Sequence, residues 1–253
     1  MTWFVKDNGY ELFFNRDESV SRSRAQKPSV QYIEDVRYIS PTDVDAGGTW
    51  IAVNQFGVSV CLLNHYQYEQ IATYKKWVSR GEIVRSFANT NNLVSAELKF
   101  KDLSLDDYRA FRMFIIDRFG NNFLCIWDGH SSRIEMSVST PKSSSSVDAK
   151  HVKTARKKLF RDVGLQDSYN TSKFLEFHAG HTPNKSQESV CMHRTDANTV
   201  SLSHIVVDGD TINFSYADGA PCEAELGPAE QIILTPFDES AKNQSISLAA
   251  TNR

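Results

Sequence analysis

The chain has 253 residues, of which 40% are hydrophobic and 23% are charged, an ordinary globular composition that provides for one substantial core. The formal net charge of -3 gives no basic field that would attract nucleic acid. No apolar run is long enough to cross a bilayer, and the first residues lack the charged start and apolar core of a signal peptide, so a cytoplasmic protein is expected.

Strands are expected near both ends and in the middle of the chain, where short apolar runs are separated by turn-forming residues. In the first run Tyr10, Leu12 and Phe14 lie on one face and the intervening residues on the other. The expected strands cover residues 10–15, 50–53, 58–63, 112–117, 123–127, 200–206 and 212–216. An N-terminal strand is expected to pair with the first of these, because only a short turn around residues 7–9 separates the two. Three tight turns join neighbouring strands: NQFG at 54–57, FGNN at 119–122 and DGD at 208–210.

Helices are expected over about residues 68–87, 93–100 and 172–178, and over a fourth stretch that begins near residue 147. Ser146, at the end of a Pro/Lys/Ser loop, is expected to cap this fourth helix. Its apolar residues recur at helical spacing, at Val152, Ala155, Leu159 and Val163. Strands, then helices, then strands again favour an α+β protein with two sheets packed face to face and helices outside.

No long Pro/Gly linker divides the chain. Residues 1–253 are therefore expected to form a single domain. The tail after about residue 237 is polar and is expected to be disordered.

Four polar residues, Asn15 to Glu18, follow the first expected strand and by themselves are typical of a solvated turn. The run GYELFFNRDE at 9–18, however, resembles the signature of the NRDE family, the family of the transport-and-Golgi-organisation proteins. Two further segments resemble the same family in the same order: AGGTWIAVN at 46–54, and MHR at 192–194 with TVS at 199–201. The resemblance covers most of the chain and implies a soluble haem-binding protein that acts in intracellular haem trafficking.

The chain is also similar, more distantly, to bile-salt hydrolases and penicillin V acylases, which are N-terminal-nucleophile enzymes. The similar residues are NRD at 15–17, NQFG at 54–57 and the pair Leu63-Asn64. This similarity implies a four-layer αββα sandwich in which Asp17 holds a free α-amino group and Asn64 helps to bind an oxyanion. A polar strand end is an equally good interpretation of Asn64.

The N-terminus departs from the family pattern. The family usually begins Met-Cys, and removal of the Met exposes the cysteine, whereas this chain begins Met1-Thr2-Trp3. Either a Met-Cys lies upstream of the sequence as written, or the nucleophile is absent. Thr2 is a weaker candidate nucleophile because it lies a few residues out of register. An N-terminal-nucleophile amidohydrolase or acyltransferase, acting on a small acyl amide or thioester, is therefore the alternative to a haem carrier.

The haem-carrier hypothesis requires a pocket between sheets and loops, and Asp17, Asn64 and Arg194 are predicted to converge on it near Trp3. Arg16 or Arg194 would pair with the propionates. His65, His193 or Met192 would contact the iron. Partners would be haem or another small amphipathic ligand, and haem-donor or haem-acceptor proteins. The candidate ligand-binding residues are Asn15, Arg16, Asp17, Asn64, His65, His193 and Arg194.

The four cysteines and the remaining histidines are expected to have structural roles and not to bind a ligand. None of the cysteines belongs to a Cys-x-x-Cys pair, so all are expected to be reduced structural thiols: Cys61, Cys125, Cys191 and Cys222. His178 and His181 are three residues apart, but the nearby Gly180 favours a solvated helix end over a metal-binding pair, and no metal is assigned. His204 is expected to be a satisfied core histidine. The Lys/Arg run at 150–161 indicates a solvated helix face or, less simply, a docking surface for an acidic partner.

Overall fold

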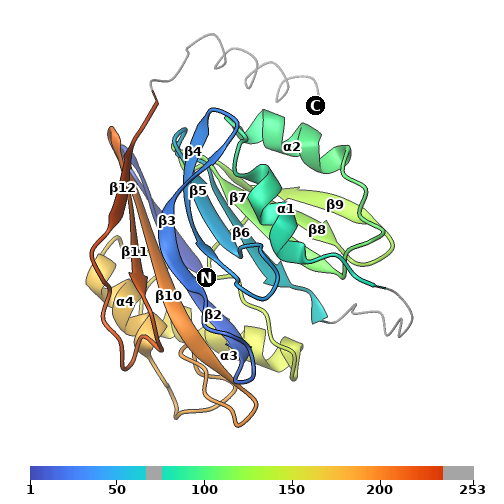
Figure 1. Ribbon diagram of the computed structural model, residues 1–253. Helices are drawn as coiled ribbons and strands as arrows, with labels where there is room; N and C mark the ends of the chain where they lie inside the picture. Colours follow the sequence, from blue (N-terminus) through green and yellow to red (C-terminus); the bar gives the residue numbers. More distant parts are fainter. Residues whose placement is uncertain (67–75, 236–253) are drawn as a thin grey trace.

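The computed structural model describes residues 1–66 and 76–235, which form two β-sheets with helices on their outer faces (Figure 1). The five-stranded sheet has the order β1 (Thr2–Lys6), β2 (Gly9–Ser19), β10 (Ala197–Asp208), β11 (Thr211–Ala217) and β12 (Glu230–Ile233). The seven-stranded sheet runs through β3 (Gln26–Ile33), β4 (Val36–Thr42), β5 (Ile51–Asn54), β6 (Ser59–Asn64), β7 (Phe111–Ile116), β8 (Asn122–Trp127) and β9 (Ser132–Met136). Paired strands are antiparallel throughout both sheets.

The four helices form the two outer layers of an αββα sandwich, as expected. They are α1 (Arg80–Phe87), α2 (Leu93–Lys101), α3 (Ala149–Asp162) and α4 (Thr171–Ala179). Helices α1 and α2 pack on the seven-stranded sheet, where Phe87 and Phe100 join its outer apolar cluster. Helices α3 and α4 pack on the five-stranded sheet through Phe160 and Phe174. No helix in the described ranges is long and apolar enough to cross a membrane.

Strand β2 shows how the sequence pattern builds these layers. Tyr10, Leu12 and Phe14 point into the core between the two sheets, as their alternation predicts. Phe13 points the other way, into the cluster beneath α3 and α4, and its ring stacks on His204. Because both faces of β2 are covered, every residue from Gly9 to Phe14 is buried.

The predicted hairpins at residues 54–57, 119–122 and 208–210 are confirmed, and so are helices α2 and α4. The helix expected over residues 68–87 begins only at Arg80, and its residues 68–75 lie outside the described part, as does the tail after residue 237. Ser146 does not cap α3, because Asp148 accepts the hydrogen bond from the His151 amide. Val163 is 48% exposed, because α3 has already ended at Asp162.

Candidate functional site

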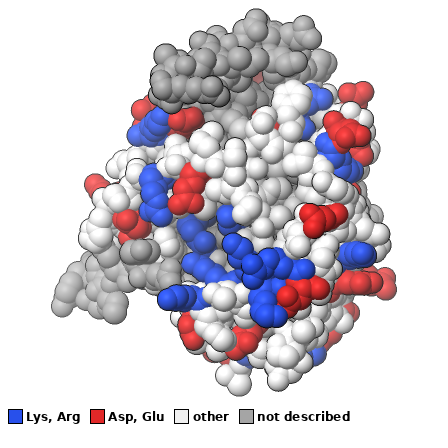
Figure 2. All heavy atoms as spheres, turned by 180° about the vertical axis from the view of Figure 1, so that it is seen from behind, with Lys and Arg blue, Asp and Glu red and all other residues white. Residues whose placement is uncertain are grey.

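An open pocket of about 920 Å³ lies where β1 begins and where β2 and β6 end. Its walls combine apolar and basic side chains, among them Trp50, Trp77 and Met192 on the apolar side. Among the described residues, seven arginines and lysines and four carboxylates line it, although the whole chain is acidic. Figure 2 shows that basic side chains gather on one face of the molecule. The lining therefore favours an anionic ligand with an apolar body.

The structure brings most of the sequence-derived candidates to this pocket and leaves two outside it. The lining includes Thr2, Asn15, Arg16, Asp17, Asn64 and Arg194. His65 is buried at the end of β6, and His193 lies in a separate cluster with His181; neither lines the pocket. Of the three candidate iron ligands, Met192 is the one that reaches the lining. Roles in binding or catalysis stay predictions for all of these residues.

The charge of the Arg16 side chain is already paired within the protein. Its side chain is only 7% exposed, and its Nη2 donates to Glu18 Oε2 and to Asp43 Oδ2, both at 3.1 Å. The guanidinium also stacks on Trp50, 4.1 Å from the ring centroid. Because two carboxylates already neutralise it, Arg16 fixes the Trp50 wall more directly than it offers charge to a ligand.

Arg194 is also paired, but nearer to solvent. Its guanidinium donates to both oxygens of the exposed Asp196, and its Nη1 donates to Ser146 Oγ at 3.1 Å. Asp17 accepts a hydrogen bond from Thr199 Oγ1 at 2.6 Å and lies 3.8 Å from an Arg156 nitrogen. Asp17 therefore links the end of β2 to β10, whereas Arg194 links the segment before β10 to the loop before α3.

Lys142 is a pocket residue that the sequence did not point to. Its backbone N–H donates to the Met1 carbonyl and its own carbonyl accepts from the Met1 α-amino group, both at 3.0 Å. Burial and the nearby Arg112 lower the pKa of the Lys142 ammonium. Burial also lowers the pKa of the Met1 α-amino group to about 5. Within the described residues the Lys142 side chain has no carboxylate partner, so its charge is available to a ligand.

A buried hydrogen-bond relay starts from Thr2, at the base of the pocket. Thr2 Oγ1 lies 2.8 Å from His178 Nε2, and His178 Nδ1 lies 2.9 Å from Asn15 Oδ1. The Asn15 amide nitrogen donates to the carbonyls of His178 and Val190, so its oxygen must face His178. His178 Nδ1 therefore carries the proton, and Nε2 accepts from the Thr2 hydroxyl.

This relay corrects the expectation that His178 belongs to a solvated helix end. The side chain is fully buried within α4, and burial keeps the pKa of the imidazole well below its usual range. His204, by contrast, is the satisfied core histidine that was expected, because its Nε2 lies 2.9 Å from Glu11 Oε2.

The expectation of structural thiols describes Cys61 and Cys125, but Cys191 and Cys222 have different surroundings. All four cysteines are free, and Cys61 and Cys125 are buried in strands, where burial raises the pKa of each thiol. Cys191 and Cys222 instead lie beside two imidazoles, in a group with metal-ligating atoms.

Comparison with known proteins identifies the family and the fold. The model of the family Transport and Golgi organisation 2 matches residues 2–217. No curated protein sequence matches the chain significantly.

Three solved enzymes share the fold. A variant of conjugated bile acid hydrolase from Clostridium perfringens has a TM-score of 0.53 and 10% identity, covering 92% of this chain and 95% of its own. Penicillin V acylase from Agrobacterium tumefaciens has a TM-score of 0.52 and 11% identity, with coverages of 93% and 86%. The N-acylethanolamine-hydrolyzing acid amidase ortholog of Caenorhabditis elegans has a TM-score of 0.56 and 10% identity, with coverages of 79% and 88%. At these identities the likeness shows the fold alone, which is that of N-terminal-nucleophile hydrolases.

Proposed function

The chain belongs to the Transport and Golgi organisation 2 family, and from this premise we propose that its pocket binds haem as cargo in intracellular haem trafficking. The observation that supports the proposal most is the mixed lining of the pocket. Trp50 and Trp77 contribute apolar surface to the lining, and basic side chains surround them. Haem is a flat apolar ring with two carboxylates at one edge, so it matches both parts of such a lining.

In this proposal the propionates bind at Lys142 and Arg194, and the ring packs against the tryptophans. Lys142 has no carboxylate partner among the described residues, whereas the charge of Arg194 is shared with Asp196. Met192, the one sequence-derived iron candidate among the lining residues, would contact the iron through its thioether. One weak axial ligand suits a carrier, which must release haem to an acceptor protein.

Lys142→Ala and Arg194→Ala are each expected to raise the Kd for haem about tenfold, the loss of one charge-assisted hydrogen bond. The measurement is a titration followed by the Soret band, with the melting temperature recorded for each variant. Lys150→Ala, on the exposed face of α3, is the matched control and should bind like the parent. Linear, non-saturating uptake by the parent, or unchanged affinity in both pocket variants, would refute haem binding in this pocket.

A second candidate function, hydrolysis of a small acyl amide or thioester, is favoured by the relay of Thr2, His178 and Asn15. A hydroxyl, a neutral imidazole and an orienting amide in this order form a nucleophile–base–orienter arrangement. Asn64 lines the same pocket, with its amide N–H donating to Tyr66 Oη at 2.7 Å. It is the candidate to bind an oxyanion, as Asp17 is to hold an amine.

Thr2→Val tests whether the hydrogen-bond relay is catalytic, with Thr2 as the nucleophile of a hydrolase, or purely structural. The variant leaves His178 Nε2 without its donor and is expected to lower the free energy of unfolding by about 1–2 kcal/mol in either case. If Thr2 is a nucleophile, the parent also releases amine from short N-acyl amides, Thr2→Ser keeps the activity and Thr2→Val loses it. A parent with no hydrolysis above the buffer rate, or an active Thr2→Val, eliminates the hydrolase.

A further inference from the structure

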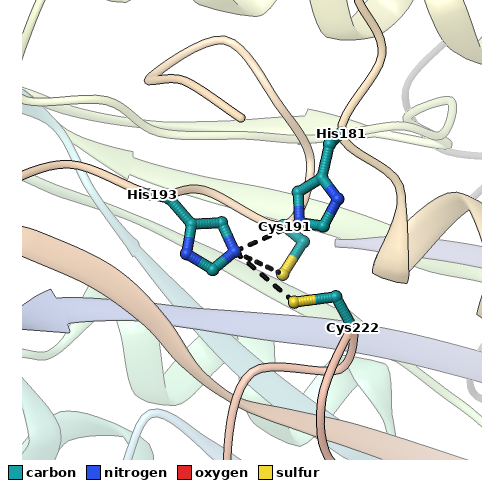
Figure 3. Close-up of side chains that lie close together, drawn as sticks. All are labelled: His181, Cys191, His193 and Cys222. Carbon is teal, nitrogen blue, oxygen red and sulfur yellow. Dashed lines mark hydrogen bonds between the residues drawn. The ribbon is translucent and has the colours of Figure 1, made fainter. Parts of the chain in front are cut away.

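Four side chains that commonly bind metals lie together outside the pocket (Figure 3). His181 follows α4, Cys191 and His193 precede β10, and Cys222 lies in the loop after β11. Their imidazole nitrogens and thiol sulfurs all lie within 4.8 Å of one another. Cys191 is fully buried and the other three residues have intermediate exposure, so the group lies partly below the surface. The proposed haem pocket uses none of their metal-ligating atoms.

The distances within the group match those of a tetrahedral metal site. The two Nε2 atoms of His181 and His193 are 3.1 Å apart. The sulfurs of Cys191 and Cys222 each lie 3.5 Å from His193 Nε2. Zinc bonds of about 2.0 Å to nitrogen and about 2.3 Å to sulfur, at tetrahedral angles, place two nitrogens about 3.3 Å apart and nitrogen and sulfur about 3.5 Å apart. The three separations that involve His193 are thus close to those that one ion imposes, and the other three are no more than 4.8 Å.

Hydrogen bonding alone gives a poor account of this arrangement. An imidazole nitrogen carries either one proton or one lone pair in the ring plane, so it makes one good hydrogen bond. Three neighbours nevertheless converge on Nε2 of His193, as the dashed lines in Figure 3 show. A cation at the centre would accept a lone pair from each of the four atoms and would remove this conflict.

We propose that His181, Cys191, His193 and Cys222 bind one Zn²⁺ ion. Two thiolates and two imidazoles are a ligand set of structural zinc sites, and four protein ligands leave no position for a substrate. Binding displaces the thiol protons, so zinc affinity rises with pH.

The ion would add to the hydrogen bonds that already order a segment without regular secondary structure. Residues 180–196 contain neither helix nor strand. Met192 and Arg194 line the pocket and alternate along this segment with the ligands Cys191 and His193. Zinc bound to the ligands would therefore also hold one wall of the pocket in place.

The full-length chain, purified under reducing conditions and supplied with Zn²⁺, is expected to contain about one zinc per molecule by mass spectrometry of the metal. Cys222→Ser and His181→Gln should each bind zinc at least about a hundredfold more weakly. His130→Gln changes a histidine in the exposed turn between β8 and β9 and should keep the parent stoichiometry.

Two measurements on the unaltered chain keep the test independent of how the variants fold. Co²⁺ in place of zinc should give thiolate-to-metal charge-transfer bands and the visible bands of tetrahedral cobalt. A chelator should make Cys191 and Cys222 reactive toward N-ethylmaleimide, while the buried Cys61 and Cys125 stay unreactive. The proposal is overturned if the reduced chain takes up neither ion, or if a His181→Gln/Cys222→Ser double variant binds zinc as tightly as the parent.

Discussion

Replacing Arg156 with alanine is expected to lower the free energy of unfolding by about 3–5 kcal/mol, because a buried charged group that holds several partners is lost. The guanidinium, 8% exposed, donates to three consecutive carbonyls, those of Gln187, Glu188 and Ser189, at 3.2, 3.2 and 2.8 Å. It also lies near Asp17, with 3.8 Å between the closest nitrogen and oxygen. Urea unfolding of the variant measures the loss.

Two further variants show whether the stability depends on the several N–H donors of the guanidinium or on its charge alone. Arg156→Lys keeps the charge but offers a single ammonium, so it should recover only a small part of the lost stability. Lys157→Met, at an exposed neighbouring position on α3, should change the free energy of unfolding by less than about 0.5 kcal/mol. Full stability of Arg156→Lys would contradict the account, because it would make the three-carbonyl geometry unimportant.

Arg156 also shows where helical periodicity stops being informative. The spacing of apolar residues placed Ala155 on the buried face of α3, whereas the residues buried there are Val152, Arg156 and Phe160. Arg156 is buried because three carbonyls of a loop distant in the sequence accept its hydrogen bonds. The spacing of residues within α3 cannot predict the position of that loop. The same limit explains Lys142, whose position depends on pairing with Met1 across most of the chain.

Tight turns and alternating strands, in contrast, were readable from the sequence. The hairpin at residues 54–57 depends on Asn54, whose side-chain oxygen accepts from two turn amides while its nitrogen donates to the carbonyls of Ala88 and Thr90. Strands β3, β4, β9 and β12 were missed. β3 and β12 are largely exposed, and β3 carries Pro28 beside a register shift, so their polar residues conceal the alternation.

The candidate functional residues also differ in how far the sequence predicts them. Asn15, Asp17, Asn64 and Arg194 stand out because family-like motifs contain them, and they do line one pocket. The His/Cys cluster has weaker signals: a Cys-x-His pair at 191–193, a histidine ten residues earlier and a cysteine on another loop. Only the fold brings these three segments together.

Gly48→Val is expected to destabilise the chain by about 3 kcal/mol, because the new side chain has no space and its neighbours cannot move aside. A Cβ at Gly48 would lie 2.6 Å from the carbonyl carbon and 2.8 Å from the Cα of Gly81, both in the first turn of α1. The contact is backbone against backbone, and the Thr49 N–H donates to the Gly81 carbonyl at 3.2 Å. Chemical unfolding of the variant beside the parent measures the effect.

The position next to Gly48 provides the control. Gly47 has a φ of +70°, but a Cβ added there would meet no heavy atom within 4 Å, so Gly47→Asn meets only local backbone strain and should cost at most about 1 kcal/mol. Gly48 and Gly81 both line the pocket, so Gly48→Val should move α1 away from the Trp50 wall and weaken the proposed haem binding together with stability. Equal effects at the two glycines would show that backbone conformation, and not the close approach of α1, fixes this wall.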